Sequence, residues 1–163
     1  METQLFQTER SDWYFVISAS LVFFSALGVT LWDFLVLREM VFLFDLVNVF
    51  GLVLFLVGVS IRLVAKRTLG KYYSYGLRTL RGHKIVKHGI YKYVRHPISL
   101  AVIIYGIAIP IFFESLYGFL LILGLVPCII YRIRIEERML VEEFGDEYRE
   151  YMKKTKKMIP KVY

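Results

Sequence analysis

The stretch Gly89-Ile90-Tyr91-Lys92-Tyr93-Val94-Arg95-His96-Pro97 decides how the chain folds, because a basic and aromatic segment ends there at a proline that opens a long apolar run. Pro97 lacks a backbone N–H but fits the first turn of a helix, where that group would have no partner. It also biases His96 towards an extended conformation. The sequence therefore predicts a helix that begins at Pro97. Arg95 and His96 then stand just outside an N-terminus that favours an anion.

The composition is that of an integral membrane protein rather than of a soluble domain. Of the 163 residues, 57% are hydrophobic, and the mean hydropathy is +0.54. Long apolar runs with few charges indicate membrane-spanning helices. The length predicts a single domain over residues 1–163. The single cysteine, Cys128, excludes an intrachain disulfide.

Four apolar runs predict membrane spans at residues 13–32, 41–61, 97–113 and 116–131. The first has a tryptophan at each end, and it is too long and wrongly flanked for a signal peptide. A polar turn is expected at 33–40. In the second span, Asp45 indicates either an interfacial acid or a functional charge. Only Glu114 and Ser115 separate the last two spans, which must therefore form a tight antiparallel hairpin.

Lysine and arginine concentrate in two blocks that flank these spans. Nine of the 21 lie in residues 66–96, which contain no acid, and nine more lie in 132–163. Arg62, Lys66 and Arg67 close the second span. The positive-inside rule places both blocks, and with four spans both termini, on the cytoplasmic face. Membrane flanks also explain the high pI, so we expect no nucleic-acid partner.

Both blocks contain further predicted helices. Residues 66–96 have the pattern of an interfacial amphipathic helix broken by Gly70, Gly76 and Gly82. The fourth helix is expected to leave the membrane, continue to about Phe144 and stop at Gly145, which acts as a C-cap. A short charged helix follows at 146–157, and we expect its tyrosines to pack it onto the preceding helices.

The hairpin brings polar residues together at one cytoplasmic mouth, because its third helix starts where its fourth ends. A guanidinium and an imidazole that face two glutamates suit a zwitterionic ligand with a carboxylate and an ammonium. The three histidines, at 83, 88 and 96, have no carboxylate or thiolate in their own block, so no metal site is expected. The residues expected at the mouth are His83, Gly89, Tyr91, Arg95, His96, Arg132, Arg134, Glu136 and Glu137.

These segments resemble the isoprenylcysteine carboxyl methyltransferases and their phospholipid methyltransferase relatives. The matching segments are 83–91, 95–97, 134–140, 144–148, Tyr151 and Ile159-Pro160. The resemblance implies an all-α polytopic membrane fold of about four spans with a C-terminal helical hairpin. It also implies S-adenosylmethionine bound at the cytosolic side, with a lipid-facing opening for the acceptor. The family usually has Tyr and Gly where this chain has Ser99 and Ala101.

The resemblance also implies roles for individual residues. Arg95, His96 and Glu137 would be catalytic. The cofactor pocket would be lined by His83, Val86, Gly89, Tyr91, Arg95, His96, Pro97, Glu136 and Glu137. The expected reaction is methyl transfer to a lipophilic acceptor that enters from the bilayer. The carboxylate of a prenylated cysteine needs no base, because it is already ionised at pH 7. An amine would first lose a proton, which His96 or a glutamate could accept.

Three other functions stay open at this point. The acceptor could be a phospholipid or another lipophilic amine or thiol. The C-terminal Ile159-Pro160-Lys161-Val162-Tyr163 is similar to the end of NADPH-dependent membrane sterol reductases. A non-catalytic membrane adaptor is the third, and it predicts no nucleotide binding. The short chain without a targeting segment fits a prokaryotic plasma membrane slightly better than an endoplasmic reticulum. The predicted spans contain no Gly-x-x-x-Gly motif, so the sequence does not indicate an oligomeric state.

Overall fold

The computed structural model describes residues 9–37, 44–70 and 85–159, with side chains from residue 14 onward. All regular structure in these ranges is helical, apart from one isolated β-bridge between Val94 and Lys156. The long helices are α1 (Glu9–Trp32), α2 (Leu46–Leu69), α3 (Pro97–Phe112) and α5 (Leu125–Phe144). Shorter elements are the π-helical turn η1 (Asp33–Leu37), the 3₁₀ turn η3 (Gly89–Lys92), α4 (Leu116–Leu123) and α6 (Asp146–Lys154).

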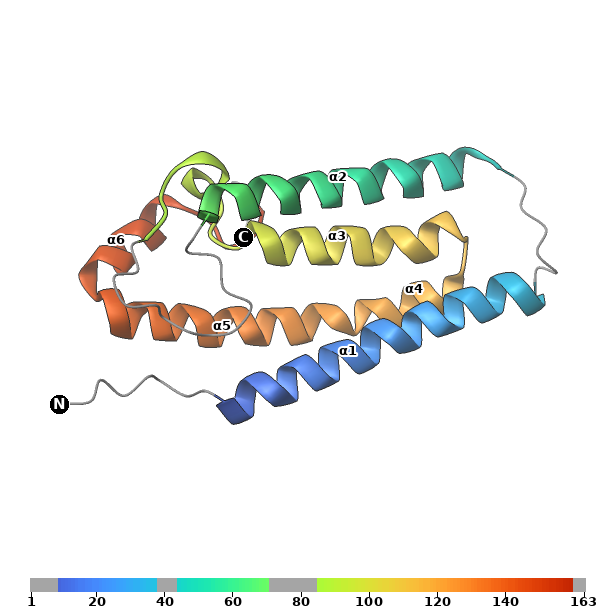
Figure 1. Ribbon diagram of the computed structural model, residues 1–163, viewed down its shortest axis with the longest axis horizontal. Coiled ribbons are helices and arrows are strands. Elements are labelled where there is room, and N and C mark those ends of the chain that lie inside the picture. The colour runs from blue at the N-terminus through green and yellow to red at the C-terminus, as the bar shows by residue number, and fades with distance from the viewer. Residues whose placement is uncertain (1–8, 38–43, 71–84, 160–163) are drawn as a thin grey trace.

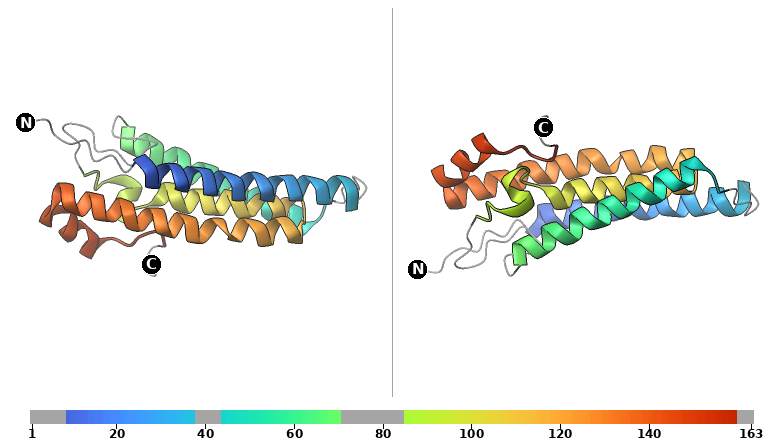
Figure 2. Two further views of the ribbon diagram at one scale, coloured as in Figure 1. Left: turned by 90° about the horizontal axis from the view of Figure 1, so that it is seen from below. Right: turned by 90° about the horizontal axis from the view of Figure 1, so that it is seen from above.

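The helices run side by side along one long axis (Figure 1). α2 and α3 form the most extensive pair and run antiparallel, while α1 packs against α4 and α5. The views from below and above show the same elongated bundle, with α6 and η3 at one end (Figure 2). We call this end the mouth: it consists of η3, the start of α3, the last turns of α5, and α6 with the segment after it. α3 is the central helix, since none of its residues is exposed.

Two glycines allow α2 and α3 to pack backbone against backbone. A Cβ atom added at Gly51 would lie 2.6 Å from the backbone N of Phe112, and one at Gly58 would lie 2.9 Å from that of Tyr105. Gly51 and Gly58 are seven residues apart on α2, and Tyr105 and Phe112 are seven residues apart on α3. The close contact therefore repeats every two turns along one face of each helix. Ala65 continues the α2 face and is completely buried. The glycines matter here because they remove side chains from a close helix–helix approach.

Three helical segments are long and apolar enough to cross a membrane: Tyr14–Leu37, Leu46–Leu69 and Leu116–Phe144. α3 is apolar but has only 16 residues. At 1.5 Å per residue it is about 24 Å long, less than the roughly 30 Å hydrocarbon core of a bilayer. None of its residues is exposed, because neighbouring helices cover it at least in part, so it does not have to match the lipid by itself. The predicted all-α membrane fold is confirmed.

Two helix ends agree with the sequence predictions. α3 begins at Pro97, although His96 has φ −122° and ψ 56° rather than the extended backbone expected before a proline. α5 ends at Phe144, and the next residue, Gly145, has φ +55° and donates its N–H to the carbonyl of Val141. This positive φ is the reason a glycine ends the helix there.

The second apolar helix begins later than the predicted residue 41. Asp45 is its N-cap: one carboxylate oxygen accepts from the N–H groups of Val47 and Asn48, at 2.7 and 3.2 Å. The Asn48 side chain accepts from the N–H of Asp45 in return, which completes a capping box. Asp45 is therefore a capping acid at the helix end and not a charge within a span. The helix continues past the predicted end at 61 to Leu69, where Gly70 (φ +53°) stops it.

Three further boundaries differ from the prediction. The polar turn expected from residue 33 is helical as far as Leu37, because the chain adds one π-helical turn. The fourth helix is interrupted at Gly124, since Pro127 has no N–H for the carbonyl of Leu123. α6 ends at Lys154 rather than 157, because Thr155 adopts an extended conformation. Of the helix expected over 66–96, the first residues belong to α2, and 71–84 lie outside the described residues.

Candidate functional site

Arg95 is the centre of the mouth, and it joins three segments of the chain. Its Nε donates to Oε1 of Glu137 on α5 at 2.8 Å. Its Nη1 donates to the carbonyls of Met152, at 3.2 Å, and Thr155, and to Oγ1 of Thr155 at 3.3 Å. The residue is buried, with 8% of its surface exposed. Arg95 thus fixes the end of α6 to α5 and to the segment before α3.

The chain after α6 passes alongside the residues that precede α3. The N–H groups of Arg95 and His96 donate to the carbonyls of Lys156 and Lys157, both at 2.8 Å, and the N–H of Lys156 donates to the carbonyl of Tyr93 at 3.2 Å. We call residues 155–157 the C-terminal strap. These bonds hold the backbone of Arg95 and His96 in place.

His96 lies between two carboxylates. Nδ1 is 3.6 Å from Oε2 of Glu136, and Nε2 is 3.5 Å from Oε1 of Glu137. The ring is buried, and Nε2 has no hydrogen-bond partner among the described residues. Burial alone would lower the pKa of His96, but the charges of Glu136 and then Glu137 raise it to about 9. The imidazole is therefore a cation at neutral pH.

Glu137 receives three cationic groups on one buried side chain. Besides Arg95 and His96, Nζ of Lys157 lies 3.3 Å from its Oε2. Only 8% of the side chain is exposed, compared with 38% for the neighbouring Glu136. The two glutamates therefore differ in what they can do: Glu137 is occupied within the protein, and Glu136 remains accessible at the mouth.

The two tyrosines of α6 pack it against the same cluster. Tyr148 and Tyr151 are buried, and their rings meet edge to face with centroids 5.8 Å apart. Tyr151 donates its hydroxyl to the carbonyl of Tyr91 at 2.6 Å, which ties α6 to η3. Burial raises the pKa of Tyr151 to about 12, and burial together with the nearby Glu137 also raises that of Tyr148. Both phenols stay neutral.

The other predicted cofactor residues are distributed around this cluster. Tyr91 is buried in η3, and Pro97 is buried in the first turn of α3. Gly89 (φ +59°) approaches α2, where an added Cβ would lie 3.0 Å from the side chain of Thr68. Val86 is half-buried, and His83 lies outside the described residues. The structure thus brings together Arg95, His96, Pro97, Glu136 and Glu137, with Tyr91 linked to them through Tyr151.

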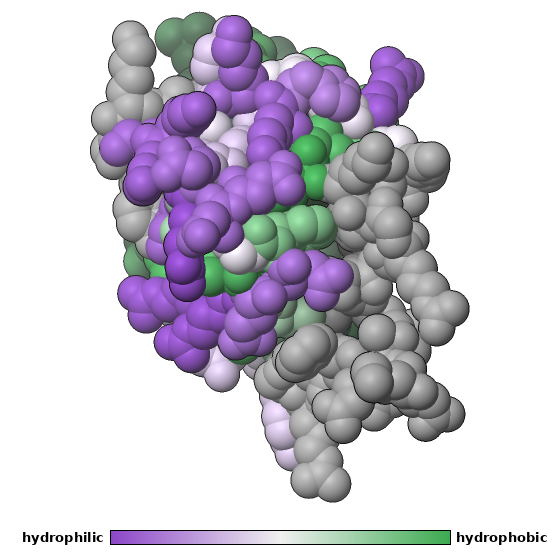
Figure 3. Space-filling model, turned by 90° about the vertical axis from the view of Figure 1, so that its left-hand side faces the viewer, coloured by the Kyte–Doolittle hydropathy of each residue, from purple (hydrophilic) through white to green (hydrophobic). Residues whose placement is uncertain are grey.

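The sequence did not indicate the partners of Arg95 and Glu137 in α6 and the C-terminal strap. Met152 and Thr155 contribute backbone carbonyls to Arg95, and no side-chain pattern encodes that. Lys157 is one of many basic residues near the end of the chain. Figure 3 looks onto the mouth, where the described hydrophilic residues gather around a few hydrophobic ones.

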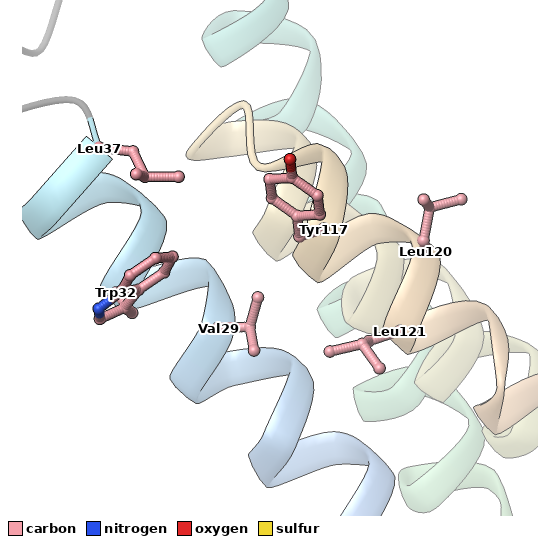
Figure 4. Close-up of a pocket in the computed structure, with 6 residues that line it drawn as sticks. All are labelled: Val29, Trp32, Leu37, Tyr117, Leu120 and Leu121. Carbon is pink, nitrogen blue, oxygen red and sulfur yellow. The ribbon is translucent and has the colours of Figure 1, made fainter.

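A shallow apolar cavity of about 660 Å³ lies elsewhere, between α1 and α4. Figure 4 shows the side chains around it: Val29, Trp32, Leu37, Tyr117, Leu120 and Leu121. It is near the hairpin end of the bundle, away from the mouth. Its lining contains no ionisable group except the phenol of Tyr117, so it offers no charged group to a polar cofactor.

The fold and the mouth define an integral membrane protein whose helices end in a buried cluster of charges. A sequence profile of the isoprenylcysteine carboxyl methyltransferase family matches residues 51–142. This match includes α3, the hairpin, and α5 through Glu137. The chain belongs to that family.

Individual relatives agree with this assignment. Protein-S-isoprenylcysteine O-methyltransferase of Saccharomyces cerevisiae is 32% identical over 127 residues, which cover 71% of this chain and 49% of the relative. Methanethiol S-methyltransferase 1 of Bradyrhizobium diazoefficiens is 34% identical over 96 residues, or 53% of this chain and 33% of the relative. The solved structure of a eukaryotic intramembrane Ras methyltransferase of this family superposes with a TM-score of 0.70 at 22% identity, covering 95% of this chain and 54% of that one. The chain thus spans about half the length, or less, of these relatives.

Proposed function

We propose that this chain is an S-adenosylmethionine-dependent methyltransferase that acts on a lipophilic acceptor reached from the bilayer. The observation that carries the proposal is the cationic His96 between Glu136 and Glu137 at the start of a buried helix, in a chain of this family. The proposal includes the orientation in which the mouth faces the cytoplasm, which the two blocks of basic residues support.

The charges at the mouth suit the amino-acid part of such a cofactor. The buried Nε2 of His96 faces Oε1 of Glu137 at 3.5 Å but makes no hydrogen bond among the described residues, so a protonated ring has a donor that a ligand carboxylate can share. The half-exposed carboxylate of Glu136 offers an acceptor to an ammonium group. A carboxylate and an ammonium on one carbon are what an α-amino acid presents. We propose that these two residues hold the cofactor, with Tyr91 and Pro97 beside them.

Arg95 and Glu137 have a different part in this proposal. Their polar atoms are used within the protein, on each other, on Lys157 and on the carbonyls after α6. They therefore serve as positioning residues that fix His96, rather than as the groups that touch the reacting atoms. This refines the catalytic role expected for them from the sequence.

When bound, S-adenosylmethionine supplies an electrophilic methyl group on a sulfonium. The protein's contribution is to orient the acceptor and to keep water away from its nucleophile. The favoured acceptor is the carboxylate of a prenylated cysteine, which the name of the yeast relative supports. A lipophilic thiolate is the second candidate, supported by the similarity to the methanethiol S-methyltransferases.

The test is cofactor binding by calorimetry on detergent-purified protein, with S-adenosylhomocysteine and NADPH titrated separately. We expect binding of S-adenosylhomocysteine alone. His96→Asn should weaken it by about tenfold or more, since a charged hydrogen bond is worth roughly 1.5–3 kcal/mol. The matched control is His88→Asn, because His88 is exposed and outside the cluster; this change should leave binding as it is.

Acceptor choice is tested with radiolabelled cofactor and two small acceptors, N-acetyl-S-farnesylcysteine, whose amine is blocked, and a long-chain alkyl thiol. Transfer to the first supports the carboxylate acceptor, and transfer to the second alone supports the thiol. Folded protein that binds neither S-adenosylhomocysteine nor NADPH would contradict the methyltransferase proposal and support an adaptor. Binding of NADPH alone would support a reductase.

A further inference from the structure

Arg62 is a charged side chain within an apolar, membrane-length helix. It lies in α2, seven residues before the end at Leu69, which places its Cα about 10 Å inside that end at 1.5 Å per residue. The side chain is half-buried, and its neighbours Leu63 and Val64 are exposed apolar residues. A charge at such a depth is costly unless a counter-charge or polar groups compensate it, and it marks a functional position by default.

The compensation that the protein provides is one phenol. Nη1 of Arg62 donates to the hydroxyl of Tyr105 on α3 at 3.2 Å, and the guanidinium carbon is 6.0 Å from the centre of the Tyr105 ring. Within residues 9–37, 44–70 and 85–159, no carboxylate pairs with Arg62. A guanidinium has five N–H donors, so Arg62 can bind further acceptors besides the hydroxyl of Tyr105.

The direction of the side chain argues against a simple anchor at the membrane surface. An arginine near a helix end normally extends towards water. Here the spacing of the glycine contacts fixes the register of the two helices: Tyr105 stands opposite Gly58, four residues before Arg62 and farther from the mouth. By binding Tyr105, the guanidinium points towards the middle of the bundle. Lys66 and Arg67, one turn later and exposed, are the residues placed to anchor the helix in the headgroups.

We propose that Arg62 and Tyr105 form a binding site for the oxyanion of an amphiphile whose apolar tail lies in the bilayer. A guanidinium binds a carboxylate or a phosphate with paired N–H groups, and a phenol adds one donor. Two sources have this chemistry: the carboxylate of the methyl acceptor, held about two helical turns from the start of α3, and the phosphate of an anionic membrane lipid. The first source rests on the proposed function, and the second does not.

The experiment measures binding without the cofactor, so its result is independent of whether the protein transfers methyl groups. The protein in nanodiscs of neutral phosphatidylcholine is titrated with N-acetyl-S-farnesylcysteine and with its uncharged methyl ester, and binding is followed by intrinsic fluorescence. In a second arm, native mass spectrometry compares retention of phosphatidylglycerol with that of phosphatidylcholine. We expect the anionic member of at least one pair to bind about tenfold more tightly or to be retained preferentially.

Variants assign the preference to the proposed site. Arg62→Gln should remove it, and Tyr105→Phe, which keeps the ring in place, should reduce it. Arg67→Gln is the matched control, since it removes one exposed charge from the same helix, and the preference should persist. A preference for the farnesylcysteine acid identifies the acceptor carboxylate, and a preference for phosphatidylglycerol identifies a lipid phosphate. Equal binding within both pairs, or a preference unchanged in Arg62→Gln and Tyr105→Phe, would overturn the proposal.

Discussion

Glu137 is the residue whose loss should damage the mouth most. It is buried and bears contacts from Arg95, His96 and Lys157, so Glu137→Gln would leave several cations without their anion. Breaking a buried ion pair by changing one partner typically costs about 3–5 kcal/mol. We expect a clear fall in the thermal midpoint of the purified protein, followed by circular dichroism in detergent.

A surface pair at the same end of the molecule provides the control. Nζ of Lys87 is 2.6 Å from Oε1 of Glu147, but the two side chains are 41% and 60% exposed. Exposed pairs contribute about 0–1 kcal/mol, so Glu147→Gln should scarcely change the thermal midpoint. Equal effects of the two substitutions would mean that the buried cluster does not hold the mouth together.

His96 predicts a dependence of stability on pH. Its pKa is raised by the two glutamates, against burial, from 6.5 to about 9. A raised pKa in the folded state adds stability that is complete below about pH 6.5 and is lost as the pH passes about 9. The thermal midpoint of the native protein should therefore exceed that of His96→Asn by a margin that shrinks from pH 6 to pH 10. A margin that stays constant over this range would show that His96 is not held as a cation.

At this scale the sequence predicted which residues meet, but not how they share their contacts. The hairpin forces Arg95 and His96 to lie beside Glu136 and Glu137, and that followed from the order of the segments. The bonds from Arg95 to the carbonyls of Met152 and Thr155 join residues 57 and 60 positions apart, through backbone atoms that every residue has. Nothing in the side-chain pattern could have indicated them.

At the scale of elements, the close contact of α2 and α3 depends on glycine. Gly58→Ala should destabilise the protein, because the new Cβ would lie 2.9 Å from the backbone of Tyr105. Overpacking typically costs about 1–3 kcal/mol, more than the gain of up to about 1 kcal/mol from the better helix propensity of alanine. Thermal unfolding of the variant measures the net effect.

Gly28 in α1 is the matched control, because a Cβ added there would meet nothing within 4 Å. Gly28→Ala should leave the thermal midpoint unchanged or raise it. A destabilisation of the same size in both variants would mean that α2 and α3 do not pack as closely as described. The sequence shows these glycines, but a search for small residues four apart misses a contact that repeats every seven.

The break between α4 and α5 and the start of α2 show a second limit at this scale. The sequence shows Pro127, but only the helix bounds show that it lies about one turn after the break at Gly124. Asp45 and Asn48 have the composition of a capping box, yet they lie within an apolar run that hydrophobicity alone extends across them. Hydrophobic length predicts that a helix exists better than it predicts where the helix starts.

At the scale of the whole molecule, the charge distribution predicts an orientation in the membrane. With Cys128 replaced by alanine, single cysteines at Lys153 in α6 and at Leu116 in the hairpin are each exposed for labelling. A membrane-impermeant maleimide added to sealed, oriented vesicles should label Lys153→Cys only from the cytoplasmic side and Leu116→Cys only from the other. Labelling of both from one side would contradict the proposed orientation.

The sequence also predicted α3 as an ordinary span, since an apolar run looks the same whether lipid or protein covers it. The structure makes it the short central helix of the bundle, with no exposed residue. That position depends on how α1, α2 and the α4–α5 pair surround it, which is a property of their packing and not of the run itself.

The C-terminal strap has a consequence for the order in which the molecule is built. Residues 93–96 leave the ribosome about sixty residues before their partners at 155–157. When residues 155–157 emerge, both helices of the hairpin have already been synthesised and are available to the insertion machinery. The mouth is therefore finished after both hairpin helices are available for insertion, when residues 155–157 fold back, and a nascent chain cut short before residue 155 lacks the bonds that position Arg95 and His96.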